Sequence, residues 1–130
     1  GFDIDETKIN VLRSEIPDRK SLNITSHRSN LKGCEIFIVA VPTPVDAHNV
    51  PDLGLLKQAC RLVGEFIDPE ALVIFESTVF PGATQRVAGK ELMEVSGLSI
   101  HNDDSTSEKG HFYLGVQLQG HLLYSGRHTS

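Results

Sequence analysis

The chain has 130 residues, of which 39% are hydrophobic and 22% charged, and its formal net charge is -5. These values fit one globular domain of ordinary size and argue against a disordered chain. The acidic balance argues against a nucleic-acid partner or an anionic membrane surface, because both bind basic patches. No apolar run approaches the ~20 residues that span a bilayer, so we expect no membrane partner.

The chain opens on Gly1-Phe2-Asp3-Ile4-Asp5, which reads as the end of a strand whose beginning would precede Gly1. Asp5 is a suitable N-cap for a helix that Pro17 would end. The apolar face of this helix consists of Ile9, Leu12 and Ile16. Residues 22–25 alternate between apolar and polar side chains, as expected for a short edge strand. Residues 26–33 fit a single helical turn.

Two apolar runs rich in β-branched residues dominate the middle of the chain, at residues 35–44 and 71–84. Each ends abruptly in Pro, Gly, Ser or Thr, which is typical of a strand buried on both faces and followed by a loop. Between them, an apolar helical stripe starts after Asp52, a plausible N-cap, and stops at Asp68-Pro69. Strand, helix and strand at this spacing predict a βαβ unit, and ligands bind at the carboxyl ends of such strands.

A further helix is predicted from about Ala83 to Val95, with Gly97 as its C-terminal cap. Beyond Ile100 the character of the chain changes, and residues 101–110 read as loop or disorder. Residues 112–115 fit a last short strand. After it, the hydrophobic residues show no clear helical or strand period.

The cysteines and histidines indicate neither a disulfide scaffold nor a metal centre. Cys34 and Cys60 are too few for such a scaffold, and we expect both thiols to be buried and inert. No secretory signal precedes the first strand, so a reduced, cytoplasmic setting is predicted. The six histidines lack the spacing of metal ligands, so no metal site is predicted.

Four segments resemble, in the same order, the N-terminal NAD-binding domain of the UDP-glucose/GDP-mannose dehydrogenase family, the nucleotide-sugar dehydrogenases. They are residues 1–5, 37–44, 51–53 and 76–84. The last, Glu-Ser-Thr-Val-Phe-Pro-Gly-Ala-Thr, is similar to the branch that oxidises UDP-N-acetylmannosamine or UDP-N-acetylglucosamine. The resemblance implies an oxidoreductase of polysaccharide biosynthesis that converts a sugar 6-hydroxyl to a carboxylate and reduces two NAD+. For the intact family protein it also implies a UDP-sugar substrate and a homodimer.

The fold implied by the resemblance is α/β, a Rossmann-type doubly wound parallel sheet with strand order 3-2-1-4-5-6. Strands 2 to 5 of that sheet are predicted here, strand 6 is left open, and strand 1 with its Gly-x-Gly-x-x-Gly turn would lie before Gly1. We therefore expect an incomplete sheet lacking its first strand, with residues 1–100 as a partial NAD-binding domain. Because the first strand is central, the 130-residue chain alone should be poorly stable and bind NAD weakly or not at all.

Residues 101–130 are predicted to form a divergent, loop-rich tail. The family continues into a Gly-Tyr-Ser-Pro-Glu-Arg motif, whereas residues 112–115 start that way and then run Val116-Gln117-Leu118. A changed reading frame or an altered splice would produce such a tail. The central helix, the substrate domain and the later catalytic Lys, Asn and Cys of the family would lie beyond this chain.

Two candidate cofactor contacts precede the first long loop. Asp3 ends a predicted strand, where a carboxylate can accept both hydroxyls of the adenosine ribose; the alternative is a surface Asp that caps the following helix. In the family, the turn that matches Pro42-Thr43-Pro44 passes beside the cofactor. Thr43 can offer a hydroxyl and a backbone N–H there, while prolines such as Pro42 make the turn rigid. The alternative is a turn that merely ends a strand.

The candidate catalytic residue is Thr78, since the matching family threonine lies at the active site, orients catalytic water and contacts the cofactor. Glu76 and Ser77 are predicted beside it as cofactor-binding residues. The alternatives are that Ser77 and Thr78 only cap a helix and that Glu76 faces solvent. The whole interpretation requires Thr43 and Thr78 to project from the same edge of two adjacent parallel strands.

Three functional hypotheses follow. The first is a fragment of an NAD-dependent UDP-sugar 6-dehydrogenase that supplies half of the cofactor site and one active-site threonine. The second is a non-catalytic product, a truncated or frame-altered domain. The third is a fragment of a β-hydroxyacid-type dehydrogenase. The sequence does not determine which nucleotide sugar is used, since every substrate-reading residue would lie elsewhere.

Overall fold

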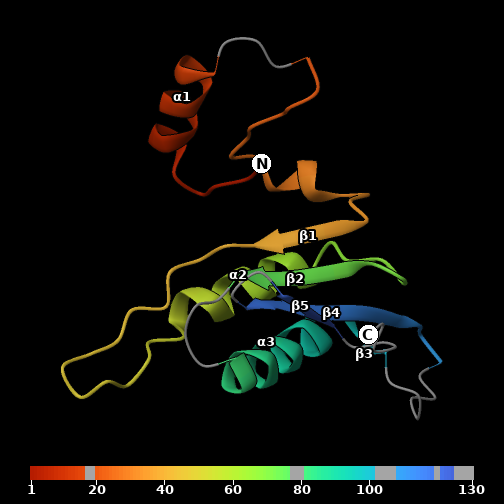
Figure 1. The fold of residues 1–130 in the computed structure, drawn as a ribbon. Coiled ribbons are helices and arrows are strands. Elements are labelled where there is room, and N and C mark those ends of the chain that lie inside the picture. Colours follow the sequence, from red (N-terminus) through yellow and green to blue (C-terminus); the bar gives the residue numbers. More distant parts are fainter. Residues whose placement is uncertain (17–19, 77–80, 102–107, 119–120, 125–130) are drawn as a thin grey trace. The chain divides into compact units, whose positions relative to one another are not determined.

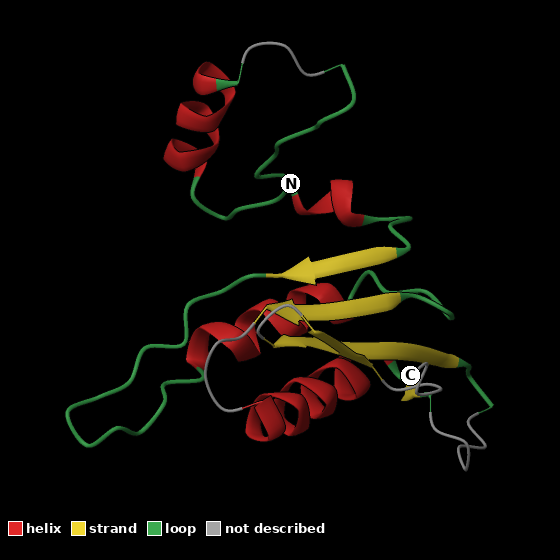
Figure 2. Ribbon diagram, viewed as in Figure 1, coloured by secondary structure: helices red, strands yellow, loops and turns green. Residues whose placement is uncertain are grey.

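The computed structural model describes residues 1–16, 20–76, 81–101, 108–118 and 121–124. It divides into two compact units, residues 1–32 and 33–130, and each is described by itself. The first unit holds helix α1 (Glu6–Glu15) and the 3-10 helix η1 (Arg28–Leu31). The second holds β1 (Ile36–Val39), α2 (Gly54–Gly64), β2 (Leu72–Glu76), α3 (Pro81–Ser96), β3 (Ser99–Ile100), β4 (His111–Leu118) and β5 (His121–Tyr124). Figure 2 shows these elements coloured by type.

In the first unit, the predicted helix is present, but its predicted apolar face is only partly buried. The Asp5 carboxylate accepts hydrogen bonds from the backbone N–H groups of Thr7 and Lys8, which confirms Asp5 as the N-cap of α1. Ile9 is buried, whereas Leu12 and Ile16 are exposed, so the predicted three-residue stripe is wrong in extent. A unit of this size has little surface against which a whole helix face can be covered.

The two strands predicted in this unit are reduced to a single parallel bridge between Phe2 and Thr25. It is held by backbone hydrogen bonds from Asp3 N to Thr25 O at 3.2 Å and from Thr25 N to Gly1 O at 2.9 Å. The helical turn predicted within residues 26–33 is present as η1.

The second unit is built on a sheet with strand order β1-β2-β4-β3. These four strands are parallel, and β5 adds to β4 in antiparallel orientation. The predicted α/β class is confirmed, and so is the predicted βαβ unit, which is β1-α2-β2. The strand predicted at residues 112–115 is present, and as β4 it is longer than predicted and parallel to β2.

The sheet buries one face. Alternate residues of β1, β2 and β4 are buried, and they share that face: Phe37, Val39, Val73, Phe75, Leu114 and Val116. The crossovers β1-α2-β2 and β2-α3-β3 step in the same direction across the sheet, so their helices cover the same side. On the other face, Ile36 and Ile38 are 59% and 65% exposed. The prediction of burial on both faces is therefore wrong for β1, because the described part of this unit places no helix over that side.

The crossover helices α2 and α3 pack closely. A Cβ added at Gly64 of α2 would lie 2.9 Å from the Cβ of Val95 on α3, so glycine permits this approach. At the rim, Arg61 Nη1 lies 2.9 Å from Glu91 Oε2. Such an exposed ion pair adds little to stability, so the packing of α2 against α3 depends mainly on apolar contact.

Of the two helix caps predicted in the second unit, the one at the end of α3 is confirmed and the one at the start of α2 is wrong. The backbone N–H of Gly97 bonds to the Met93 carbonyl with φ at +73°, which confirms Gly97 as the C-terminal cap of α3. Asp52 is not the N-cap of α2, because the helix begins at Gly54 after Leu53. The Asp52 carboxylate instead accepts the Gly54 N–H at 2.9 Å, one residue ahead of the capping position.

The predicted loop-rich character of residues 101–130 does not extend to residues 111–118 and 121–124, which are strands. Phe112, Leu114 and Val116 point into the core at alternate positions, which explains why this part of the tail joins the sheet. No helix in the described parts of the chain is long and apolar enough to cross a bilayer.

Candidate functional site

The candidate site lies at the carboxyl edge of the parallel sheet. β1 and β2 are adjacent and parallel, with Val39 aligned to Phe75, so the chain leaves both strands on the same side. The segment after β1 carries Pro42 and Thr43, and the segment after β2 begins beyond Glu76. The strand arrangement required for the dehydrogenase interpretation is therefore present, while Ser77 and Thr78 lie outside the described residues.

The turn after β1 is held at its C-terminal end by a backbone hydrogen bond. Thr43 is half-buried, and Pro42 and Pro44 are exposed. The Pro44 carbonyl accepts a hydrogen bond from the Asp52 N–H at 2.7 Å, which joins the two ends of the following loop. With φ fixed at both prolines, the backbone on either side of Thr43 has little freedom. Thr43 thus lies in a segment that the two prolines restrict, just beyond the carboxyl end of β1.

Glu76 is the last residue of β2 and is exposed. It aligns with Gln117 of β4, and strand alternation places it on the face opposite the buried Phe75. Its carboxylate is therefore on the side of the sheet that α2 and α3 leave open. Both alternatives predicted for Glu76, cofactor contact and solvent exposure, fit that position.

Asp3 belongs to the first unit and is half-buried. Its Oδ1 accepts the Asp5 N–H at 2.8 Å, while Asp5 itself caps α1. The capping role that competed with a ligand role for Asp3 is thus taken by Asp5. Among the described residues, Oδ2 of Asp3 accepts no hydrogen bond, so one carboxylate oxygen can receive a ligand hydroxyl.

The two thiols differ in environment. Cys60 on α2 is fully buried, and this burial, with a smaller contribution from the nearby Glu91, raises its pKa to about 12. At neutral pH the thiol stays protonated and is a poor nucleophile. Cys34 is only half-buried, so the expectation of two buried cysteines holds for Cys60 alone.

A histidine cluster that sequence spacing missed lies at the opposite edge of the sheet. The rings of His101 and His111 are 5.8 Å apart, and that of Tyr113 lies 4.8 Å from His101. The Tyr113 hydroxyl donates to Glu70 at 3.2 Å, which raises the tyrosine pKa. The alternation of His111 and Tyr113 on one strand face was the available signal. In the parts that the structure describes, no three His, Cys, Asp or Glu residues are placed to hold a metal ion.

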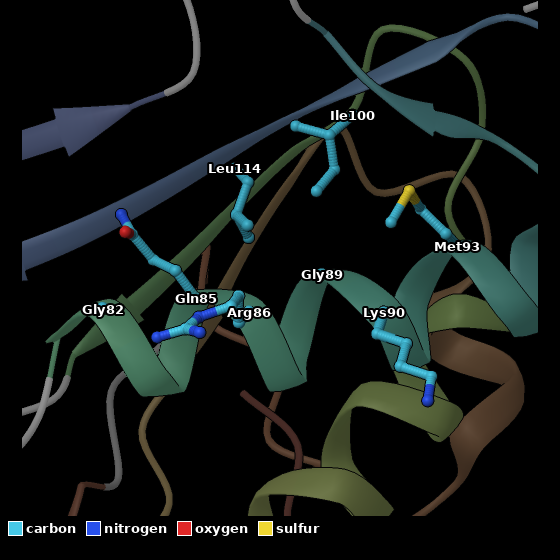
Figure 3. A pocket seen from close by; sticks show the side chains of 8 residues that line it. All are labelled: Gly82, Gln85, Arg86, Gly89, Lys90, Met93, Ile100 and Leu114. Atoms are coloured by element: carbon cyan, nitrogen blue, oxygen red, sulfur yellow. The ribbon is translucent and has the colours of Figure 1, made fainter.

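A shallow cavity of about 410 Å³ runs along α3, where that helix meets β3 and β4 (Figure 3). Ile100 and Leu114 form its apolar wall, and Arg86 and Lys90 stand on the helix beside it. Lys90 lies 4.0 Å from Glu94, so one of the two cations already has an acidic neighbour. Of the predicted site residues that the structure describes, namely Asp3, Pro42, Thr43 and Glu76, none lines this cavity.

Comparison with known proteins identifies the family. Residues 1–105 match the family model described as "UDP-glucose/GDP-mannose dehydrogenase family, NAD binding domain". The chain belongs to this family. It is 37% identical over 114 residues to UDP-N-acetyl-D-glucosamine 6-dehydrogenase of Pseudomonas aeruginosa, a match that covers 79% of the chain and 27% of that relative. It is 39% identical over 122 residues to UDP-N-acetyl-D-mannosamine dehydrogenase of Pyrococcus horikoshii, covering 94% and 29%.

A solved structure supports the same assignment. A UDP-D-ManNAc dehydrogenase from Pyrococcus horikoshii superposes with a TM-score of 0.74 at 30% identity, covering 92% of this chain and 30% of that one. The chain thus spans under a third of the length of these relatives and corresponds to their N-terminal part. The predicted family, the Rossmann-type fold and NAD as the cofactor of the domain are confirmed.

Proposed function

We propose that this chain is the cofactor-binding part of an NAD-dependent UDP-N-acetylhexosamine 6-dehydrogenase. The observation that carries the proposal is the shared carboxyl edge of β1 and β2, one followed by Pro42-Thr43-Pro44 and the other by Ser77-Thr78. The relatives named for UDP-N-acetyl-D-glucosamine and UDP-N-acetyl-D-mannosamine support the substrate class. In parallel α/β sheets this edge is where ligands bind.

Two described residues, one in each unit, supply groups of the kind that bind a dinucleotide. Oδ2 of Asp3 accepts no hydrogen bond from a described residue, and Thr43 carries a hydroxyl in the segment after β1. When bound, NAD+ accepts hydride from the sugar C6 carbon. Within the proposal, Asp3 binds the adenosine ribose, Thr43 and Ser77 contact the cofactor, and Thr78 orients the catalytic water. Glu76 would line the same edge from the open face of the sheet.

The proposal also includes the setting that the sequence predicts. Neither Cys34 nor Cys60 is part of a disulfide, which fits a reducing, cytoplasmic compartment. A nucleotide sugar acid is an activated building block, so a role in polysaccharide biosynthesis follows from the proposed reaction. Homodimer formation is proposed for the intact enzyme by analogy with the family.

The test is an assay of the native protein that carries these 130 residues, with NAD+ and each of four substrates. These are UDP-N-acetylglucosamine, UDP-N-acetylmannosamine, UDP-glucose and a β-hydroxyacid. We expect two NADH per sugar oxidised, with an N-acetylhexosamine preferred. Activity with the hydroxyacid alone would favour the third hypothesis, and absence of turnover with all four would favour the non-catalytic one.

Asp3 offers a specific test of the cofactor role. Replacing Asp3 by alanine should raise KM for NAD+ about tenfold, because a charged hydrogen bond contributes roughly 1.5–3 kcal/mol. The same change should weaken discrimination against NADP+, since the carboxylate no longer repels a 2′-phosphate. Steady-state kinetics with both cofactors measure the two effects.

The control is Asp5→Ser, which keeps a capping oxygen two residues away and should leave both KM values unchanged. If Asp3→Ala behaves like this control, Asp3 is only a surface residue and the ribose assignment is wrong.

A further inference from the structure

The loop between β1 and α2 is a closed arm rather than an open connection. Val45 and Pro51 form an antiparallel bridge, and the Asp46 N–H bonds to the Val50 carbonyl at 3.0 Å. At the base of the arm, the Asp52 N–H donates a hydrogen bond of 2.7 Å to the Pro44 carbonyl. In Figure 1 this arm, residues 45–51, extends beyond the C-terminal end of β1, on the side of the candidate site.

One side chain organises the arm. Oδ1 of Asp46 accepts the backbone N–H of His48 at 2.8 Å and that of Val50 at 2.9 Å. The Asp46 carbonyl accepts the Asn49 N–H at 3.1 Å, and Asn49 has a φ of +60°, a conformation that Asn tolerates better than most residues. A single carboxylate oxygen thus satisfies two amides at the tip of the arm.

Apolar burial does not hold the arm in place. Val45 is 49% exposed and Val50 55% exposed, and residues 45–50 are all exposed. The shape of the arm therefore depends on its hydrogen bonds, and two of them converge on Asp46. Without that acceptor both amides can bond to water instead, and the loop gains conformational freedom.

We infer that Asp46 is a positioning residue for the NAD+ site and acts through Thr43. The inference rests on the proposed function. Thr43 directly precedes Pro44, whose carbonyl accepts the hydrogen bond from the Asp52 N–H at the base of the arm. Loss of the hydrogen bonds within the arm therefore loosens the backbone on the C-terminal side of Thr43. The expected consequence is weaker cofactor binding with the chemical step unchanged, because the two hydrogen bonds that Asp46 accepts order the loop backbone.

The experiment compares Asp46→Ala with Asp46→Asn, which keeps an Oδ1 acceptor, and with His48→Ala, which keeps the backbone N–H that Asp46 binds. Two quantities are measured on the native protein: hydrogen exchange at the amides of residues 48 and 50, and KM and kcat with NAD+. Asp46→Ala should speed exchange at both amides and raise KM for NAD+ about five- to tenfold, with kcat within twofold. The other two variants should match the wild type.

The outcomes separate this inference from the proposed function. A wild type without dehydrogenase activity or NAD+ binding overturns the proposed function and the role of Asp46 with it, whatever the exchange data show. An active wild type whose Asp46→Ala variant exchanges faster but keeps its KM overturns the inference alone. A lower kcat with unchanged KM would mean loss of folded protein, which is a merely structural role and also contradicts it.

Discussion

Under the proposed function, replacing Thr78 by alanine will lower kcat of the native protein that carries this chain about 100-fold and change KM for NAD+ much less. The expectation follows from the proposed role, since a hydroxyl that orients catalytic water contributes mainly in the transition state. Removing one such hydrogen-bonding group typically costs 10²–10³ in kcat. Steady-state rates of NADH formation with the preferred UDP-sugar measure the effect.

Two control variants test whether the loss of kcat is specific to the Thr78 hydroxyl. Thr78→Ser keeps the hydroxyl and should retain most of kcat. Ser99→Ala removes a hydroxyl from β3, whose partner His111 begins β4 at the opposite edge of the sheet, and should leave the kinetics unchanged. Equal kcat for Thr78→Ala and the wild type would show that Thr78 only caps or precedes α3.

Replacing Phe75 by alanine will destabilise the second unit by about 3–5 kcal/mol, the usual cost of removing a fully buried aromatic side chain. Phe75 is 1% exposed on the central strand β2, where it aligns with Val39 on one side and Val116 on the other. Domains of this size are stabilised by only ~5–15 kcal/mol in total, so the variant should be largely unfolded under mild denaturant. Urea denaturation followed by circular dichroism measures the loss.

The matched control for Phe75 is Ile38→Thr on the neighbouring strand. Threonine keeps the β-branched shape, and Ile38 is mostly exposed, so the change should cost no more than about 0.5 kcal/mol in this chain. A loss at Ile38 as large as that at Phe75 would show that the open face of the sheet is also buried, contrary to the structure.

Much of the local structure could be predicted. Asp5 and Gly97 were identified as caps because an N-cap oxygen and a left-handed C-terminal glycine act within a few residues of themselves. The run at residues 71–76 was recognisable as a strand from its β-branched content. Asp52 was misassigned because an aspartate that accepts an amide two residues on has the same sequence signature whether or not it is the N-cap.

The candidate site was only partly predictable. The order of β1, α2 and β2 places Thr43 and the segment after Glu76 at one edge, since parallel strands joined by a crossover end on the same side. The role of Asp46 was not visible, because a loop Asp with nearby His and Asn is common. Only the hydrogen bonds that its Oδ1 accepts from two backbone amides distinguish it. The contact of His101 with His111 was missed because the two residues are ten positions apart in the sequence.

The sequence by itself determined the family, the strand-helix-strand unit and the residue types at the sheet edge, because motifs, periodicity and caps are properties of short segments. Only the tertiary structure decided that one face of β1 is buried and the other open, that β4 joins β2 in parallel, and that the arm at residues 45–51 is closed. These features depend on which distant segments meet. That choice is made by the burial of the whole sheet against two helices rather than by any one stretch of chain.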